Sequence, residues 1–493
     1  MTSPAAPAGA PIGHAEIRTI LIGVVLAMLL GALDQTIVVT ALPTIGRDLG
    51  NAESLSWVVT AYLVTSTSVT PLYGKLSDIH GRRVTLMAAI SIFLVGSVAC
   101  ALSPSIYWLI GARAFQGLGG GALISLGQTI IGDVVAPRER GRYQAYFAAV
   151  FTTSSIAGPV LGGLFAEYLH WSLIFWINLP LGVAAYVMTS RVLRLLPRHE
   201  HPHTLDLVGA GLMLAATVSL LLALTWGGSA FPWDSAEIAG LFAASVLGWI
   251  LFSLRLAKAR EPFIPLSVLA NSVVRNGVIA MFFAIGSLVG LSVFMPLYFE
   301  AVLGLTAATS GVALIALMGG AVTGATISGR VMVHFTRYKL TAVLGLAIAA
   351  LATLALAIWP GDLSFVAVEV ILAVIGVGLG TIFPVGTTSI QNAVPLRQLG
   401  TATGVMNFFR SLGGAILVPA FSAIFLASVA AGGDLASVQT VVLEGTRNGV
   451  DFAHVFTGVF VAAAIALALA FVFQALMKEL PLRTQLDLIE ESR

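Results

Sequence analysis

The sequence is poor in charge and almost free of cysteine. Of its 493 residues, 10% are charged, compared with roughly 25% in an ordinary soluble domain. Hydrophobic residues make up 58%, and the mean hydropathy is +0.96. This composition excludes a soluble globular protein and predicts an integral membrane protein. The single cysteine, Cys100, excludes a disulfide within the chain.

Two patterns are also missing. Apolar stretches exceed the roughly 18 to 20 residues that cross a bilayer as a helix, and they lack the alternation of a strand. We therefore expect an all-α protein and no β-barrel. No GxxxxGK[ST] segment is present, so a self-contained ATP pump has no support. We expect neither ATP nor nucleic acid as a partner, and no cofactor.

Three histidines, His199, His201 and His203, stand beside Glu200 and suggest a metal site. Loop histidines without a fourth convincing ligand are usually solvated. We therefore expect no metal.

Apolar runs separated by glycine, proline or charged residues predict fourteen membrane-spanning helices. Basic residues test this count independently, because cytoplasmic loops are enriched in lysine and arginine. With both termini inside, only Arg47 and Arg447 fall in outer loops, Arg113 and Arg410 fall within spans away from their ends, and the other 21 of the 25 basic residues lie on the inner side. The predicted spans are 18–44, 55–76, 84–103, 106–132, 143–168, 172–195, 206–226, 237–257, 274–302, 310–332, 340–359, 364–388, 399–430 and 453–478.

Two charged, proline-bearing linkers divide the chain into six helices, a pair, and six more. A weak internal echo, GKLSDIHGRRVTL against GRVMVHFTRYKL, supports two related halves, although Val333 stands where Asp78 would repeat. Paired six-helix halves are the plan of many secondary transporters. The predicted segments are a flexible cytoplasmic tail (1–17), an N-terminal bundle (18–195), linkers with two extra helices (196–273), a C-terminal bundle (274–478) and a cytoplasmic tail (479–493).

The first predicted span carries an acid, Asp34, within the stretch LDQTIVVTALPTI. An ionised carboxylate at the centre of a span costs roughly 2.5 to 3.5 kcal/mol on the insertion scale, so it needs a wet cavity or a partner. Desolvation favours protonation of a carboxylate, and a nearby cation favours its ionised form. Asp34 is therefore a proton site, a permanently paired structural acid, or an acid near the outer interface.

The fourth span, with RAFQGLGGGALISLGQ, carries Arg113, the one basic residue of the first six helices that lies away from the ends of its span. Its guanidinium is always charged and must face an acid, a carbonyl or water. We expect Asp34 to be that acid. Gly117 and Gly121 have the GxxxG spacing that lets helices approach closely, and plain packing explains them as well as a transport role does.

The fifth span contains SSIAGPVLGG. Pro159 removes a backbone donor, and Gly158, Gly162 and Gly163 leave a flexible, closely packed face. Such a segment can act as a hinge in transport or be a static bend.

The turn GKLSDIHGRRVTL places one acid, Asp78, beside Arg82 and Arg83, with Gly81 permitting a tight turn. We expect this charge network to latch one conformation. Positive residues that set the topology explain the same arginines.

The second half offers further candidates for a substrate cavity. Apolar walls with few polar groups suit lipophilic ligands, and methionine suits varied ones. Most of these residues also fit a core or lipid-facing role, and interfacial solvation explains the two acids equally well. The candidates are Glu300, Glu369, Phe294, Met295, Tyr298, Met406, Asn407 and Arg410.

Taken together, these segments resemble the major facilitator superfamily, and within it the fourteen-span drug:proton antiporter subfamily, the EmrB and QacA group. The stretches SWVVTAYLV, WSLIFWINLPLG and NFFRSLGGAI are similar to subfamily segments too. The resemblance implies that Arg113 takes part in proton transfer. Two positions depart from the motifs: Ile79 replaces a commonly basic residue, which weakens the latch, and Ser154 replaces a glycine.

We therefore expect a proton-coupled multidrug exporter, not an enzyme, in a cytoplasmic (inner) membrane. It would move lipophilic, often cationic compounds by alternating access, as a monomer, with Asp34 as proton site and Arg113 assisting. A transporter of a lipid, siderophore or endogenous metabolite is the alternative on the same fold. A sensor that binds without transport is disfavoured, because embedded charges and a GP segment are costly for a scaffold.

Overall fold

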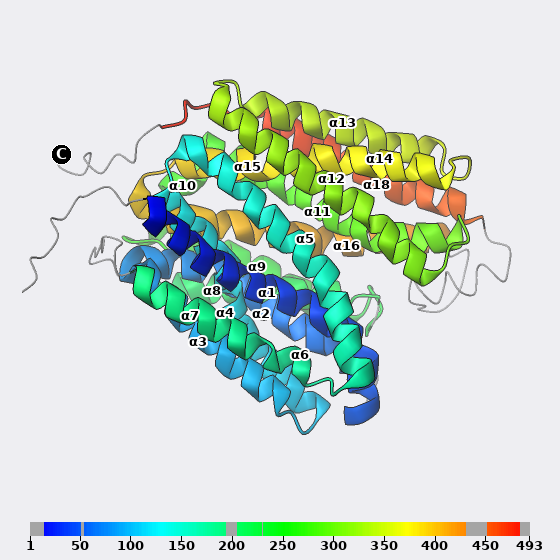
Figure 1. The fold of residues 1–493 in the computed structure, drawn as a ribbon, viewed down its shortest axis with the longest axis horizontal. Coiled ribbons are helices and arrows are strands. Elements are labelled where there is room, and N and C mark those ends of the chain that lie inside the picture. Colours follow the sequence, from blue (N-terminus) through cyan, green and yellow to red (C-terminus); the bar gives the residue numbers. More distant parts are fainter. Residues whose placement is uncertain (1–13, 51–53, 194–204, 229, 430–450, 484–493) are drawn as a thin grey trace, which may run out of the picture.

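The computed structural model describes residues 14–50, 54–193, 205–228, 230–429 and 451–483 (Figure 1). The histidines of the 199–203 stretch, Arg447 and most of both predicted tails lie outside these ranges. Within them, regular secondary structure is helical, with one isolated bridge between Gly227 and Phe231.

The helices follow the predicted segments in order. The sixth segment is divided into a short and a longer helix, and the twelfth is divided at Thr381. In the first part of the chain the elements are α1 (His14–Leu49), α2 (Leu55–His80), α3 (Arg82–Ala101), α4 (Ile106–Val134), α5 (Pro137–Tyr168), α6 (Leu173–Trp176), α7 (Asn178–Val192), α8 (Leu207–Trp226) and α9 (Ala236–Lys258). The remaining elements are α10 (Leu266–Ala270), α11 (Ser272–Ala301), α12 (Ala307–His334), α13 (Lys339–Ile358), α14 (Phe365–Gly380), α15 (Ile382–Asn392), η3 (Leu396–Gln398), α16 (Leu399–Val429) and α18 (Phe452–Leu476).

Thirteen helical stretches of the described residues are long and apolar enough to cross a membrane. Helix α2 is not among them although it has 26 residues, because its middle reads TSTSVT over residues 65–70. Its hydroxyl groups are buried between helices instead of facing lipid: Ser66, Thr67, Ser68 and Thr70 are all buried. With α2, the helices account for all fourteen predicted segments.

The helices run roughly side by side and form two groups (Figure 1). One group is built from α1 to α7 and has its own apolar cores, and the other is built from α11 to α18 around a larger core. The groups meet along two seams, in which α2 packs against α16 and α5 packs against α12. A cavity between the two groups is therefore bounded by helices of both.

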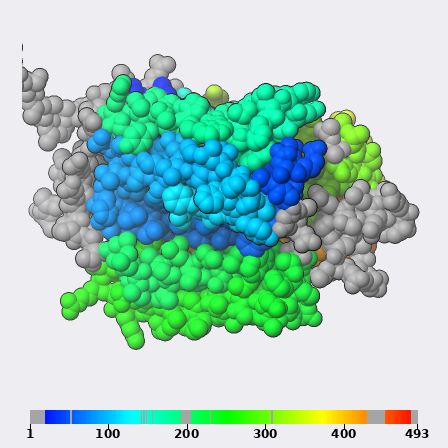
Figure 2. Space-filling model, turned by 90° about the horizontal axis from the view of Figure 1, so that it is seen from below, coloured from blue at the N-terminus to red at the C-terminus, as the bar shows by residue number. Residues whose placement is uncertain are grey.

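Helices α8 and α9 form an antiparallel pair outside both groups. Helix α8 contacts both α2 and α16, so the pair lies over one of the two seams. Figure 2 shows the pair within the green layer beside the blue N-terminal helices. Asp206 caps α8 through the N–H of Gly209 and forms an ion pair with Arg255 of α9 at 3.1 Å. This ion pair fastens the two helices at their cytoplasmic ends.

Candidate functional site

Asp34 and Arg113 form a buried ion pair. The Arg113 Nη1 lies 2.6 Å from Asp34 Oδ2, and the two side chains are 0% and 1% exposed. The other carboxylate oxygen, Oδ1, accepts hydrogen bonds from the side-chain amides of Gln116 and Asn178, both at 2.9 Å. The acid is thus fully hydrogen-bonded in its ionised form, as a charge in an apolar bundle requires.

Arg113 is held on every side. Its Nε donates to the carbonyl of Val58 in α2 at 3.1 Å, and its Nη1 donates to Gln116 Oε1 at 2.6 Å. Its guanidinium also lies 4.2 Å from the centre of the Tyr62 ring, a distance suited to a cation–π contact. The pair is therefore the centre of a network that links α1, α2, α4 and α7.

Most of this network was not predicted from the sequence. Gln116 lies three residues after Arg113, so the two side chains share one face of α4, and this spacing could have suggested it. Asn178 begins α7 and comes from 144 residues away, without any local signal. Ser97 completes the shell by accepting from Gln116 at 2.8 Å.

The glycines of α4 allow this helix to pack closely against α2. A Cβ on Gly117 would lie 2.7 Å from the carbonyl oxygen of Tyr62, and one on Gly121 would lie 3.0 Å from the carbonyl carbon of Ser66. The first distance is too short for a real Cβ, and a Cβ on Gly121 would also lie 2.9 Å from Cγ2 of Val69, so glycine is needed at both positions for this approach. Close packing of α2 and α4 keeps Arg113 within reach of the Val58 carbonyl.

At the cytoplasmic end of α2, Asp78 binds the start of α16. Its carboxylate accepts the N–H of Gly400 at 2.9 Å and both the N–H (2.7 Å) and the hydroxyl (2.6 Å) of Thr401. The first turn of a helix has free N–H groups and a partial positive charge, which suits a carboxylate. We call this contact, with Arg82, the cytoplasmic latch.

Arg82 holds the Asp78 carboxylate in place through two ion pairs. It pairs with Asp78 at 2.5 Å and with Asp133 of α4 at 2.7 Å. Gly81 has φ +86°, so a side chain would be strained at the turn before Arg82. The structure brings three of the four predicted latch residues into this turn, while Arg83 lies apart and donates to the carbonyl of Ser190 at 3.1 Å. Asp133 was not foreseen.

Further polar contacts join the halves on the cytoplasmic side. Asn407 Nδ2 donates to Gln128 Oε1 at 2.7 Å, and Gln391 Nε2 donates to the Gln128 carbonyl at 3.2 Å. Arg140, which is 1% exposed, donates to the carbonyls of Val135 and Gly132 in its own half and to Gln391 Oε1 of the other half at 3.5 Å. Burial lowers the pKa of Arg140 to about 10, so it remains charged at neutral pH. These contacts close the cytoplasmic side between the halves.

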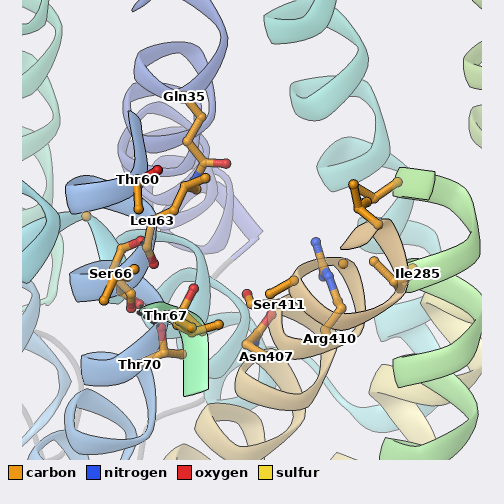
Figure 3. A pocket seen from close by; sticks show the side chains of 18 of the residues that line it. Gln35, Thr60, Leu63, Ser66, Thr67, Thr70, Ile285, Asn407, Arg410 and Ser411 are labelled. Carbon is orange, nitrogen blue, oxygen red and sulfur yellow. Dashed lines mark hydrogen bonds between the residues drawn. The ribbon is translucent and has the colours of Figure 1, made fainter. Parts of the chain in front are cut away.

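A cavity of about 640 Å³ lies between the halves, beyond this closed zone. This volume lies in the range of small-molecule sites. Its lining comes from α1, α2, α4, α5, α8, α11 and α16, so both halves and the extra helix α8 contribute. Figure 3 shows Ser66, Thr67 and Thr70 of α2 on one side and Asn407, Arg410 and Ser411 of α16 on the other.

The predicted cavity residues separate into two sets. Asn407 and Arg410 line the cavity. The other six are not among its lining residues. Four of them are fully buried in the core of the second group, namely Phe294, Met295, Tyr298 and Met406.

The two acids lie elsewhere. Glu300 is near the outer end of α11, and Glu369 is in α14, which packs against α12 and α13. Glu369 has one buried carboxylate oxygen without a hydrogen-bond partner in the described structure. A contact between either acid and substrate stays a prediction.

The GP segment of α5 packs against α1. Thr36 Oγ1 of α1 donates to the Ser154 carbonyl at 2.8 Å, and a Cβ on Gly158 would lie 3.1 Å from the backbone nitrogen of Ile37. A Cβ on Gly162 would meet Ile37 as well, whereas Gly163 has open space around it. Pro159 is exposed. Gly158 and Gly162 therefore serve a tight helix crossing, and a hinge role stays a prediction.

Within the described residues, no group of three or more His, Cys, Asp or Glu side chains is placed to hold a metal ion. The three loop histidines lie outside those residues. The expectation that no metal is bound there stays a prediction.

Comparisons with known proteins agree with this architecture. Residues 24–418 match the model of the Major Facilitator Superfamily. The chain is 34% identical to the multidrug transporter protein MdtP of Bacillus subtilis over 84% of this chain and 76% of MdtP. It is 33% identical to multidrug resistance protein 3 of the same organism, over 83% of this chain and 80% of that protein.

Solved structures show the same fold at low identity. The human organic anion transporter MFSD10 (TETRAN) matches with a TM-score of 0.63 and 16% identity, over 93% of this chain and 99% of that one. A bacterial homologue of the iron transporter ferroportin, in an outward-facing state, matches with a TM-score of 0.58 and 13% identity, over 93% and 98% of the two chains.

Proposed function

The chain belongs to the Major Facilitator Superfamily, and on that premise we propose that it couples the export of lipophilic compounds to the entry of protons. Membership and the multidrug relatives make it a multi-pass membrane transporter of the drug-transporting kind, and not an enzyme. The proposal adds the driving ion, the coupling residues and the direction of transport.

The buried pair of Asp34 and Arg113 carries this proposal. Asp34 has 0% exposure among four helices, and one cation lies beside it. Burial of a carboxylate costs free energy, so such a group is expected to have a function or to be paired permanently. Protonation of Asp34 would remove its charge and leave Arg113 without its anion. The network around the two side chains would then have to rearrange, which is what a coupling site must do.

Protonation of Asp34 could also affect the cavity, because Asp34 lies beside a residue of α1 that lines it. The next residue on α1, Gln35, lines the cavity, and Thr36 holds α5 through the Ser154 carbonyl. A shift of α1 upon protonation would therefore move a cavity wall and the α1–α5 contact together. Substrate and proton need not share one space for their binding to be linked.

Alternating access would use the cytoplasmic latch. In this structure the halves are joined on the cytoplasmic side by Asp78, Gln128 and Gln391, and the cavity lies beyond these contacts. Opening to the cytoplasm requires the contacts to break while contacts form at the outer side. We assign this structure to the outward-facing part of the cycle, in which substrate leaves and a proton enters.

The driving force is sufficient for export. One charge that crosses a membrane potential of about 100 mV releases about 2.3 kcal/mol, before any pH gradient is added. By itself this supports a gradient of substrate of roughly 50-fold, since each 1.4 kcal/mol is a factor of ten.

The test is proton movement in proteoliposomes that hold a trapped pH indicator. Addition of a lipophilic substrate outside should alkalinise the lumen in step with its uptake, because antiport exchanges entering substrate for leaving protons, and an imposed pH gradient should drive substrate against its concentration. Asp34→Asn should lose both effects while it still binds substrate. Asp48→Asn, which removes an exposed carboxylate at the outer end of the same helix, is the matched control. Full proton-driven transport by Asp34→Asn would reject the assignment.

A further inference from the structure

Arg410 gives the cavity between the two halves a fixed positive charge. The residues that line the cavity are otherwise apolar or carry hydroxyl and amide groups, and Arg410 is the one charged residue among them in the described structure. It projects from α16 into the space between the two groups, and the hydroxyl-bearing residues of α2 lie on the opposite side of the cavity (Figure 3). The net charge of the cavity wall is thus that of one guanidinium.

No group of the described residues neutralises this charge. Among the described residues, Arg410 has no ion pair and no hydrogen bond; its contacts are with the rings of Phe151 at 5.3 Å and Phe383 at 5.4 Å. Aromatic faces attract a cation but accept none of its five N–H groups in the manner of a carboxylate. The N–H groups of Arg410 are therefore available to a molecule bound in the cavity.

Acids on three of the helices that line the cavity, α1, α2 and α4, are already engaged. Asp34 is bound to Arg113, and Asp133 and Asp78 are bound to Arg82. Each of these pairs satisfies its own cation, so none is available to Arg410. A guanidinium without an acid in the chain leaves its charge and its N–H donors to water or to an anion that enters the cavity.

We propose that the substrates of this transporter are lipophilic organic anions, whose carboxylate or sulfonate binds Arg410 while the apolar body lies against the wall. The proposal deepens the proposed export function and rests on it. Apolar lining residues on several helices supply the second part of the site: Leu63, Ile124, Leu224, Ile285, Val289 and Val293. The charge expected of the cargo is opposite to the cationic one that the family resemblance implies.

The sign of the charge also changes how transport responds to voltage. A one-for-one exchange of an anion leaving for a proton entering moves two charges inward, and an inside-negative potential drives it. The same exchange with a cation moves no net charge. Transport of the true substrate should therefore be stimulated by an inside-negative potential at a fixed pH gradient.

Binding is the first test, with the purified full-length chain in detergent. The probes are dansyl-phenylalanine, which is anionic at neutral pH, its uncharged methyl ester, and a cationic dansyl diamine. The wild type should bind the acid about 10- to 100-fold more tightly than the ester, because charged hydrogen bonds are strong. Arg410→Gln should bring the two affinities together, and Arg410→Lys should retain part of the difference since it keeps the charge without the planar fork.

The controls separate the explanations. Arg397→Gln removes an exposed arginine next to the start of α16 and should leave the preference unchanged. Equal or tighter binding of ester or diamine by the wild type would overturn the proposal, and this comparison stands even if Arg410→Gln does not fold. Displacement of the acid by phosphatidylglycerol at lower concentration than by unlabelled N-acyl-phenylalanine would make the anion a lipid headgroup and overturn the small-molecule assignment; the reverse order supports it.

Flux in proteoliposomes keeps this proposal apart from the export function. Preference for the acid without gradient-driven flux would support the anion site and reject proton coupling. Proton-driven flux of the diamine or ester, with no preference for the acid, would support coupling and reject the anion site.

Discussion

Asp78 in the first half of the chain holds Thr401 in the second half through both its backbone N–H (2.7 Å) and its hydroxyl (2.6 Å). The two residues are 323 positions apart, and they meet where α2 crosses α16. The crossing is close because glycines face each other there: a Cβ on Gly404 would lie 3.2 Å from the Cα of Gly74. One carboxylate thereby binds the positive end of a helix in the opposite half.

We predict that Asp78→Asn weakens closure of the cytoplasmic side. Charged hydrogen bonds contribute about 1.5–3 kcal/mol, so the ratio of closed to open protein should fall by about 10-fold or more. Thr403→Cys, on the cytoplasmic side of Asn407 in α16, reports opening through its reaction with a maleimide applied to inside-out vesicles. Native Cys100 is fully buried and should contribute little labelling.

The control for the latch is Glu139→Gln, which removes an exposed acid from the start of α5 on the same side. It should leave labelling of Thr403→Cys unchanged. Equal labelling of the Asp78→Asn and wild-type backgrounds would show that Asp78 does not hold the halves together.

We predict that Asp34 and Arg113 are coupled in stability but separable in function. Removal of one partner leaves a buried charge alone, at a cost of about 3–5 kcal/mol. Arg113→Gln should therefore unfold at a much lower temperature than the wild type. The double variant Asp34→Asn, Arg113→Gln should recover much of that loss, yet remain without proton-driven transport. Thermal unfolding in detergent, beside flux in proteoliposomes, measures both quantities.

A purely structural pair gives a different result. The double variant would then recover transport together with stability. This outcome would remove the coupling role from both residues and favour the alternative that the acid only joins helices.

The two glycines of the GP segment should respond differently to one methyl group. At Gly158 a Cβ would press against α1, whereas at Gly163 no heavy atom lies within 4 Å of it. We expect Gly158→Ala to destabilise the protein by about 1–3 kcal/mol, as overpacking does, and Gly163→Ala to be nearly neutral. Unfolding temperatures of the two variants, purified side by side, check this. Equal temperatures would mean that α1 and α5 separate at little cost.

Helix α8 should behave as part of the cavity wall. Leu221, Leu224 and Thr225 line the cavity. No role for the extra pair of helices could be predicted from the sequence. We predict that Leu224→Cys reacts with an impermeant thiol reagent from the outside and that substrate slows the reaction. Leu247→Cys, at a position of α9 that is 56% exposed on the outer surface of the bundle, should show no protection by substrate. Protection at neither position would place α8 outside the transport path.

The ion pair of Asp206 and Arg255 should stabilise the α8–α9 pair in a pH-dependent way. Burial alone would raise the pKa of Asp206, but the Gly209 N–H and Arg255 outweigh it and hold the pKa below its ordinary value. The group thus stabilises the folded state above its unfolded pKa of about 3.9, and this contribution is lost as pH falls through the lower folded value. The unfolding temperature of Asp206→Asn should lie below that of the wild type at neutral pH.

That difference should shrink once the pH falls below about 4. Arg255→Gln removes the partner on α9 and should show the same convergence. A gap that is independent of pH would mean that the carboxylate contributes through its shape and not through its charge.

The surroundings of Asp34 show how much of the site could be predicted from the sequence. Its pairing with Arg113 was predicted because a charge in a span needs a partner, and each half-chain offers few. Its contacts with Gln116 and Asn178 were not predicted, since neutral amides cost far less to bury and so leave no signal. The same reasoning explains why Arg410 was noticed but left without a partner: in the described structure it has none.

The sequence by itself determined the membrane class, the order of the helices and the positions of the embedded charges. These follow from local hydropathy and from the cost of charge in hydrocarbon, which act on each segment separately. Only the tertiary structure decided that Asp78 binds the start of α16, that α8 walls the cavity, and that Phe294 and Tyr298 pack in a core while Arg410 faces the cavity. Those outcomes depend on which faces of distant helices meet, and the pattern of any single helix does not contain that information.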